Sequence, residues 1–230
     1  MQKKIEISNI NRILIIQTAF LGDVALTLYL VEAIKQILPN TEVYFLTTPN
    51  AAPIARLSNS ITQVIEFDKR GVHKNLKGIN HLARQINDLH IDCIIAPHRS
   101  YRTSLLSSKI SSSIKIGYDI NSNSSLVYNY RVQYHPAMHE VDRLLSLLEP
   151  FGYNFSNFKK ENIYPNLIFS NEDATSLQSI LTENDIKFVI NNSNYNAQKS
   201  IIAIAPGSVW QTKRWKIGSF IKLINILQNN

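Results

Sequence analysis

Gly22 and Asp23 lie between two apolar segments, directly after the strand-like run 13–16 (ILII) and before a stretch of helical period. In a parallel α/β sheet, ligands bind beyond the carboxyl ends of the strands, so a carboxylate at this point could act as a general base. The same position suits a cap for the following helix, whose first N–H groups need acceptors. Position alone favours neither role, and the two roles are compatible.

A second candidate is the segment 206–215 (PGSVWQTKRW), which is expected to join a strand to a helix. A Gly-Ser turn at a helix entry exposes backbone N–H groups that can hold phosphate oxygens. Thr212 would add a hydroxyl and Lys213 a positive charge. The alternative is structural: Trp210 and Trp215 would be core anchors and Lys213 would be solvated. Neither G-x-x-x-x-G-K-[ST] nor G-x-G-x-x-G occurs, so neither a P-loop nor a dinucleotide-binding turn is predicted.

The elements that must position these residues follow from the apolar pattern, because short apolar runs alternate with segments of helical period. Strands are predicted at 13–16, 42–48, 62–67, 91–96, 114–118 and 201–205. Helices are predicted at 24–38, 50–57, 76–89, 100–110, 137–148, 170–182 and 217–227. Strands separated by helices imply right-handed crossovers and a parallel sheet covered on both faces. The sequence therefore predicts an α/β fold.

These elements divide the chain into two parts. Residues 1–165 would form a complete Rossmann-like domain, and residues 166–230 the first elements of a second one. Ser170 is expected to cap the first helix of the second domain, in front of an acidic first turn. The polar stretches 119–135 and 191–200 are predicted to be a surface loop and a flexible linker. A single strand and helix after residue 200 cannot bury the strand on both faces, so the second domain is expected to be incomplete in this chain.

The composition, with 44% hydrophobic and 18% charged residues, is that of an ordinary globular protein. A lone cysteine, Cys93, cannot form an intrachain disulfide, and its apolar neighbours predict a core residue in a reducing, cytosolic compartment. In a bilayer, Asp23 would cost about 2.5–3.5 kcal/mol, so residues 13–31 are not expected to span a membrane. A signal peptide is not expected either.

A formal net charge of +7 and a pI of about 9.4 make an anionic partner plausible. The cations are scattered along the chain, and most of them are expected to be solvated. No basic-aromatic module or zinc-ligand spacing is found, so nucleic acid is not an expected partner.

Four stretches together resemble glycosyltransferase family 9, the lipopolysaccharide core heptosyltransferases. They are RILIIQTAFLGDVALTLYLVEAIKQILPNTEVYFLTT, KIGYD, HEVDRLLSLLEPFGY and IAPGSVWQTKRWKIGSF, in that order along residues 12–225. The first and the last are the most specific. The resemblance implies a GT-B fold, in which two Rossmann-like domains face each other across a cleft. The amino-terminal domain would bind the acceptor and the carboxy-terminal domain an ADP-heptose donor.

The implied activity is an inverting transfer of heptose onto the Kdo and heptose inner core of lipopolysaccharide. The acceptor would be an anionic Kdo-lipid A type molecule, reached by peripheral contact with the cytoplasmic face of the inner membrane. By the resemblance, Asp23 would be the catalytic base. Ser208, Thr212 and Lys213 would contact the donor diphosphate. No D-x-D follows a predicted strand, so neither a metal nor another cofactor is indicated.

Acceptor contacts are expected at Gly22 and at Arg99, Ser100 and Arg102, which together with His98 follow the predicted strand 91–96. Arginine suits bidentate recognition of a carboxylate. The alternative for this group is a solvated helix start.

The family also carries a D-[ST]-G-x-x-H-L-A-like element that helps to hold the donor, and this element is not found within the 230 residues. The resemblance implies that it lies beyond residue 230, with the groups that bind ribose and adenine. The alternative function is therefore a non-catalytic remnant of such an enzyme, acting at most as a binding module.

Overall fold

The computed structural model describes residues 4–183, 188–191, 194–197, 202, 204–208 and 211–228. The chain forms two compact units, Met1–Ile168 and Phe169–Asn230, called here the N-terminal and C-terminal units. In the described ranges, no helix combines the length and the apolar character that crossing a bilayer requires.

The N-terminal unit is built on a six-stranded sheet in which every neighbouring pair of strands is parallel. The strands are β1 (Arg12–Ile16), β2 (Glu42–Thr47), β3 (Gln63–Glu66), β4 (Cys93–Ala96), β5 (Ile114–Tyr118) and β6 (Tyr130–Val132), in the spatial order β3-β2-β1-β4-β5-β6. This is the strand order of a Rossmann fold. At its centre, Ile15 lies beside Phe45 on β2 and Ile95 on β4.

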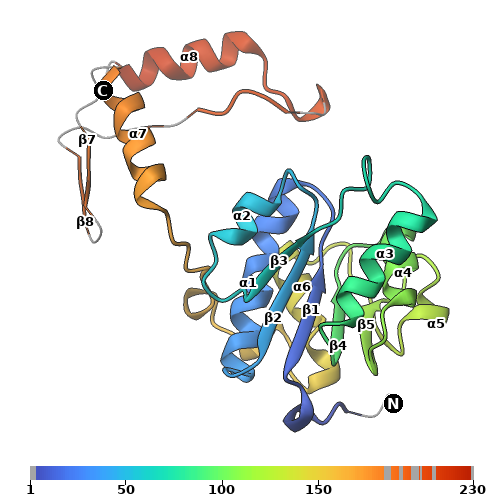
Figure 1. The fold of residues 1–230 in the computed structure, drawn as a ribbon. Helices are drawn as coiled ribbons and strands as arrows, with labels where there is room; N and C mark the ends of the chain where they lie inside the picture. Colours follow the sequence, from blue (N-terminus) through green and yellow to red (C-terminus); the bar gives the residue numbers. More distant parts are fainter. Residues whose placement is uncertain are drawn as a thin grey trace. The chain divides into compact units, whose positions relative to one another are not determined.

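Helices cover both faces of this sheet (Figure 1). They are α1 (Leu21–Ile37), α2 (Ala52–Arg56), α3 (Leu76–Asn87), α4 (Tyr101–Lys109), α5 (Ser124–Val127) and α6 (Glu140–Ser146). Successive side chains of a strand point to opposite faces. On β1, Ile13 and Ile15 therefore pack with α1 and α6, whereas Leu14 and Ile16 pack with α3 and α4. Both sets are fully buried, which is why the strand reads as a continuous apolar run. Short 3₁₀ turns occur at Ile7–Asn9, Glu149–Phe151, Phe155–Asn157 and Lys160–Asn162.

The prediction of a surface loop at 119–135 is wrong, because this segment contains α5 and β6. Val132 is buried against the core, and the buried Tyr128 places its hydroxyl 3.3 Å from that of Ser104. A three-residue strand at the sheet edge presents too few alternating residues for a period to emerge from the surrounding polar sequence. The sheet of the N-terminal unit therefore has six strands, whereas the sequence predicted five.

The starts of two helices differ from prediction by three residues. α1 begins at Leu21 and not at residue 24. The prediction missed this start because the first two residues of the helix are exposed and add nothing to the apolar period. Gly22 and Asp23 consequently lie inside the first turn of the helix. α6 is shorter than the predicted helix 137–148, and His139 occupies its N-cap position.

The C-terminal unit contains α7 (Asn171–Glu183), an antiparallel pair β7 (Phe188–Asn191) and β8 (Asn194–Ala197), a 3₁₀ turn at Gln211–Lys213, and α8 (Ile217–Gln228). Ser170 caps α7 as expected, because its Oγ accepts the Asp173 N–H at 3.0 Å. The predicted helix at 217–227 is also confirmed.

Two predictions for this unit fail. Part of the expected linker 191–200 is β8, which pairs with β7. The expected strand 201–205 is not formed at residues 202, 204 and 205, while residues 201 and 203 lie outside the described residues. An apolar run becomes a strand only where another strand takes up its backbone hydrogen bonds, and no described strand pairs with these three residues.

Candidate active site

The strand order places two candidate segments at one point of the sheet. The order reverses between β1 and β4, and the loops that leave these two strands diverge to opposite faces. In open parallel sheets, ligands bind in the crevice that such a reversal creates at the carboxyl ends of the strands. Gly22 and Asp23 follow β1, and Arg99, Ser100 and Arg102 follow β4. The fold therefore brings these sequence-predicted segments to the same edge.

Asp23 is the third residue of α1, and its Oδ2 accepts the backbone N–H of Phe20 at 3.0 Å. Phe20 is the N-cap residue, so the carboxylate reaches back to the start of its own helix. The prediction that Asp23 is the N-cap residue is wrong, because Phe20 holds that position, but Asp23 still caps the helix start from the third helical position. Among the described residues, no hydrogen bond is found to Oδ1, which leaves this oxygen open to a ligand.

The backbone next to Asp23 is approachable. A Cβ built on Gly22 would meet no atom within 4 Å, so packing does not require a glycine there. The neighbouring side chains of Phe20 and Leu21 are 67% and 51% exposed. The start of α1 therefore presents open surface beside a half-buried carboxylate.

A cluster of hydroxyl groups surrounds the imidazole of His98 and connects the loops after β1 and β4. The Nδ1 atom of His98 lies 2.8 Å from Thr18 Oγ1, 2.9 Å from Thr103 Oγ1 and 3.3 Å from Ser100 Oγ. Ser100 also caps α4, because its Oγ accepts the Thr103 N–H at 3.3 Å. The expected helix start at this residue is confirmed. Thr18 and Thr103 are almost fully buried, so this cluster belongs to the framework of the edge.

The His98 ring is held in its neutral form. Burial, helped by the nearby charges of Lys69 and Arg99, lowers the pKa of His98 to about 4. A neutral imidazole keeps one nitrogen as an acceptor, which suits a ring surrounded by hydroxyl donors.

Lys69 adds a positive charge to this edge from the loop after β3. Its Nζ donates to the carbonyl oxygen of Thr18 at 2.6 Å and to Thr18 Oγ1 at 3.2 Å. Burial, together with Arg102 and Arg70, lowers the pKa of Lys69. Arg102 in turn donates to the Lys69 carbonyl oxygen at 2.7 Å.

The two arginines of the predicted acceptor group have different neighbours. Arg102 lies against Lys69, whereas the guanidinium of Arg99 stacks over the Tyr134 ring at 4.3 Å. Within the described part of the chain, none of Lys69, Arg99 and Arg102 forms an ion pair with a carboxylate. A half-buried lysine beside an arginine, without a carboxylate to balance them, is suited to bind an anion.

Sequence reasoning missed Thr18, Lys69 and Thr103 as parts of this edge. Lys69 could have been found, because it follows the predicted strand 62–67 just as Arg99 follows 91–96. Thr18 and Thr103 gave no such indication, since a buried threonine has no distinctive sequence pattern.

The segment 206–215 is described in part. Ala205 to Ser208 have no regular structure, Thr212 and Lys213 lie in a 3₁₀ turn with exposed side chains, and Trp210 lies outside the described residues. Arg214 folds back, donating through Nε to the Ser208 carbonyl oxygen at 2.5 Å. Trp215 is 55% exposed and stacks edge-on against Phe220 at 5.3 Å, so it is not the core anchor of the structural alternative.

Comparison with known proteins identifies a family. The sequence model of glycosyltransferase family 9 (heptosyltransferase) matches residues 79–230. The chain is 22% identical to the lipopolysaccharide core heptosyltransferase OpsX of Haemophilus influenzae over 215 residues, which cover 92% of this chain and 55% of that protein.

Solved structures show the same fold. A family 9 glycosyltransferase from Veillonella parvula superposes with a TM-score of 0.78 and 21% identity, over 94% of this chain and 60% of that one. The E. coli heptosyltransferase WaaC, solved with ADP-2-deoxy-2-fluoro heptose, superposes with a TM-score of 0.57 and 20% identity, over 65% of this chain and 51% of that one. The expected fold class is confirmed, and the chain spans about half to three fifths of the length of these proteins.

The neutral state of His98 predicts a pH dependence of stability. Between pH 6.5 and about 4 the unfolded chain binds a proton at His98 that the folded chain does not, so the free energy of unfolding falls as the pH falls. Urea unfolding followed by circular dichroism across this pH range should show the free energy of unfolding falling more steeply for the wild type than for His98→Gln. The exposed His81, changed to Gln, is the matched control and should keep the wild-type slope. Equal slopes for the wild type and His98→Gln would contradict the buried neutral imidazole.

Proposed function

The chain belongs to glycosyltransferase family 9, and from this membership we propose that it acts in the inverting transfer of heptose from ADP-heptose to the inner core of lipopolysaccharide. The match of residues 79–230 carries the proposal, because it includes the segment with Ser208, Thr212 and Lys213. A heptose-ADP analogue bound to E. coli WaaC supports the nucleotide-sugar donor. The acceptor is a Kdo-lipid A type molecule at the cytoplasmic face of the inner membrane.

Asp23 is the proposed catalytic base. The acceptor hydroxyl attacks the anomeric carbon of the heptose, and the bond from that carbon to the diphosphate oxygen breaks with its electron pair leaving on ADP. The hydroxyl proton passes to the Asp23 carboxylate. The hydrogen bond from the Phe20 N–H to Oδ2 fixes this carboxylate, and the space beside Gly22 admits the acceptor. A single in-line displacement of this kind inverts the anomeric centre.

Lys69 and Arg102, with Arg99, are the proposed acceptor contacts. Kdo carries a carboxylate, and an arginine guanidinium can bind a carboxylate through two parallel hydrogen bonds. The structure supports this role because these cations lie at one sheet edge, without carboxylate partners among the described residues, and Lys69 is hydrogen-bonded to Thr18 in the segment that leads to Asp23. Ser100 contributes by starting α4, which carries Arg102.

The donor diphosphate is assigned to Ser208, Thr212 and Lys213. The departing ADP carries negative charge, so a lysine and hydroxyl groups placed at the diphosphate stabilise the transition state. Thr212 and Lys213 are exposed on a 3₁₀ turn, where a nucleotide can reach them.

The donor assignment predicts that this chain binds ADP-heptose with a micromolar dissociation constant in isothermal titration calorimetry. Lys213→Ala should weaken binding about tenfold, because a charge-assisted hydrogen bond is lost. The nearby exposed Lys216, changed to Ala, is the matched control and should bind like the wild type. Absence of binding would favour the alternative, a non-catalytic remnant of the family.

Two substitutions separate the capping and catalytic roles of Asp23. Asp23→Asn keeps an oxygen that accepts the Phe20 N–H, so its melting temperature should stay near that of the wild type. Its transfer rate with ADP-heptose and Kdo-lipid A should fall at least about 100-fold, because the amide cannot take the proton. Asp23→Ala should lose transfer and also about 1 kcal/mol of stability, because the cap is lost. Wild-type turnover in Asp23→Asn would refute the base assignment.

The acceptor assignment predicts a KM effect at Arg102. In the same transfer assay, Arg102→Ala should raise the acceptor KM about tenfold or more and leave the KM for ADP-heptose unchanged. Arg84 is an exposed arginine on α3 and serves as the control, since Arg84→Ala should change neither value. An unchanged acceptor KM in Arg102→Ala would remove this arginine from the acceptor site.

A further inference from the structure

The imidazole of His98 is a half-buried titratable group to which the proposed reaction gives no role. Its Nδ1 atom lies 2.8 Å from Thr18 Oγ1, 2.9 Å from Thr103 Oγ1 and 3.3 Å from Ser100 Oγ. Its Nε2 atom has no hydrogen-bond partner among the described residues, and it is not one of the unpartnered side-chain atoms that are sealed from solvent. The protein therefore holds one nitrogen of the ring and leaves the other accessible at the sheet edge.

The hydrogen bonds of Lys69 decide which ring nitrogen carries the proton. An ammonium group can only donate, so Thr18 Oγ1 accepts from Lys69 Nζ at 3.2 Å and keeps its own proton for another acceptor. The nearest acceptor is Nδ1 of His98 at 2.8 Å, whereas Thr103 Oγ1 is 3.4 Å away. Because Nδ1 accepts this proton, the single proton of the neutral imidazole lies on Nε2.

The charge of Lys69 favours the same tautomer. Its ammonium group binds the hydroxyl that Nδ1 contacts, and a positive charge on that side of the ring favours a lone pair over an N–H. Burial, followed by the charges of Lys69 and Arg99, lowers the pKa of His98 to about 4, so the ring is neutral at pH 7. The accessible nitrogen is therefore an uncharged N–H donor.

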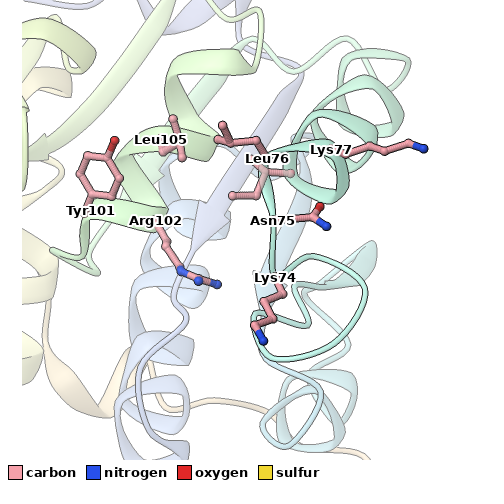
Figure 2. Close-up of a pocket in the computed structure, with 8 residues that line it drawn as sticks. Lys74, Asn75, Leu76, Lys77, Tyr101, Arg102 and Leu105 are labelled. Carbon is pink, nitrogen blue, oxygen red and sulfur yellow. The ribbon is translucent and has the colours of Figure 1, made fainter.

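A chain of hydrogen bonds joins this ring to the proposed acceptor cations. Arg102 donates to the Lys69 carbonyl oxygen at 2.7 Å, and Lys69 donates to Thr18, which contacts His98. Arg102 also lines a groove of about 740 Å³ between the amino-terminal ends of α3 and α4. Figure 2 shows its side chain extending from the start of α4. The fold thus places an uncharged donor and two cations on connected loops at one edge of the sheet.

We propose that His98 is a specificity-determining contact of the acceptor, and that its Nε2–H donates a hydrogen bond to a hydroxyl oxygen of the acceptor sugar. The inference deepens the proposed function and rests on it for the acceptor. Lys69 and Arg102 take the carboxylate of the sugar, because a carboxylate binds a charged donor more strongly than a neutral one. The neutral donor is left for an uncharged oxygen. Thr18 is a positioning residue, because its hydroxyl fixes the tautomer of the ring.

In this tautomer His98 does not compete with Asp23 as the general base. A base needs a free lone pair, but the accessible nitrogen of His98 carries a proton, and the lone pair of Nδ1 accepts from the almost fully buried Thr18. His98 therefore binds the acceptor and leaves the hydroxyl proton to Asp23. Loss of the Nε2–H should consequently change the acceptor KM and not kcat.

Two substitutions separate the roles of the two ring nitrogens. Asparagine can place an oxygen where Nδ1 lies and has no atom at the Nε2 position, whereas glutamine can place an N–H near Nε2 and loses the contact at Nδ1. In the transfer assay with ADP-heptose and Kdo-lipid A, His98→Asn should raise the acceptor KM about tenfold and keep kcat within about twofold. His98→Gln should keep the acceptor KM within about threefold of the wild-type value. His81→Asn makes the same change at an exposed histidine of α3 and should alter neither constant.

Nitrogen NMR of the imidazole tests the tautomer without donor or acceptor. In the ¹⁵N-labelled 230-residue chain at pH 7, the ring of His98 should carry its proton on Nε2. Thr18→Val should raise the population of the Nδ1–H tautomer, and Thr18→Ser, which keeps the hydroxyl, should restore the wild-type spectrum. If Thr18→Val fails to fold, the wild-type spectrum alone decides the tautomer. Addition of free Kdo should then move the Nε2 resonance.

An Nδ1–H tautomer in the wild type, or an unchanged acceptor KM in His98→Asn, would overturn the inference and leave the proposed function standing. If His98 served the framework alone, His98→Gln would be the more damaging change, and loss of kcat at unchanged KM in both variants would make the imidazole a base. A wild-type chain without transfer would contradict the proposed function. The titration with free Kdo then decides the inference by itself, since an unmoved Nε2 resonance would exclude a contact with the sugar.

Discussion

Thr18 joins the three loops on which the candidate site is built. Its hydroxyl lies within hydrogen-bond distance of His98 after β4, and both its hydroxyl and its carbonyl oxygen accept Lys69 from the loop after β3. The sheet determines which loops can meet, because parallel strands all end at the same edge. Thr18 then holds these loops in a fixed mutual arrangement, and it also leads directly into the turn that carries Asp23. Burial favours this arrangement, because Thr18 is almost fully buried and water cannot readily replace the partners of its hydroxyl and carbonyl groups.

The sequence predicted well the parts of the fold that depend on long apolar runs. β1 is a run of buried residues on both faces, and such a run can be recognised without any knowledge of its neighbours. β6 was missed because an edge strand of three residues is defined by the strand beside it, not by its own composition. The true start of α1 was missed for a related reason, because Leu21 is exposed and does not belong to the apolar period of the helix. Where an element exists only through its partners, a single sequence carries little indication of it.

The residues of the candidate site also differ in how far the sequence could predict them. Asp23, Arg99 and Arg102 could be proposed in advance, because each follows a recognisable strand and carries a charge that chemistry can use. Lys69 could have been named by the same rule, but its hydrogen bond to Thr18 could not be predicted, since its loop follows β3 and reaches past β2 to the second residue after β1. That reach depends on the spatial order of the strands, which the order of elements along the chain does not specify.

The attachment of Lys69 has a consequence for how relatives of this protein should be compared. Its shorter hydrogen bond, 2.6 Å, goes to the main-chain carbonyl of Thr18, and any residue at position 18 would supply that oxygen. Evolution can therefore exchange the side chain at this position while the loop after β3 stays attached. Where a relative carries another residue at this position, the backbone contact can persist although the alignment column differs. Conservation at position 18 would report on the hydroxyl contacts, to the imidazole cluster and to Lys69, and the backbone anchorage of the lysine would have to be traced in three-dimensional superpositions.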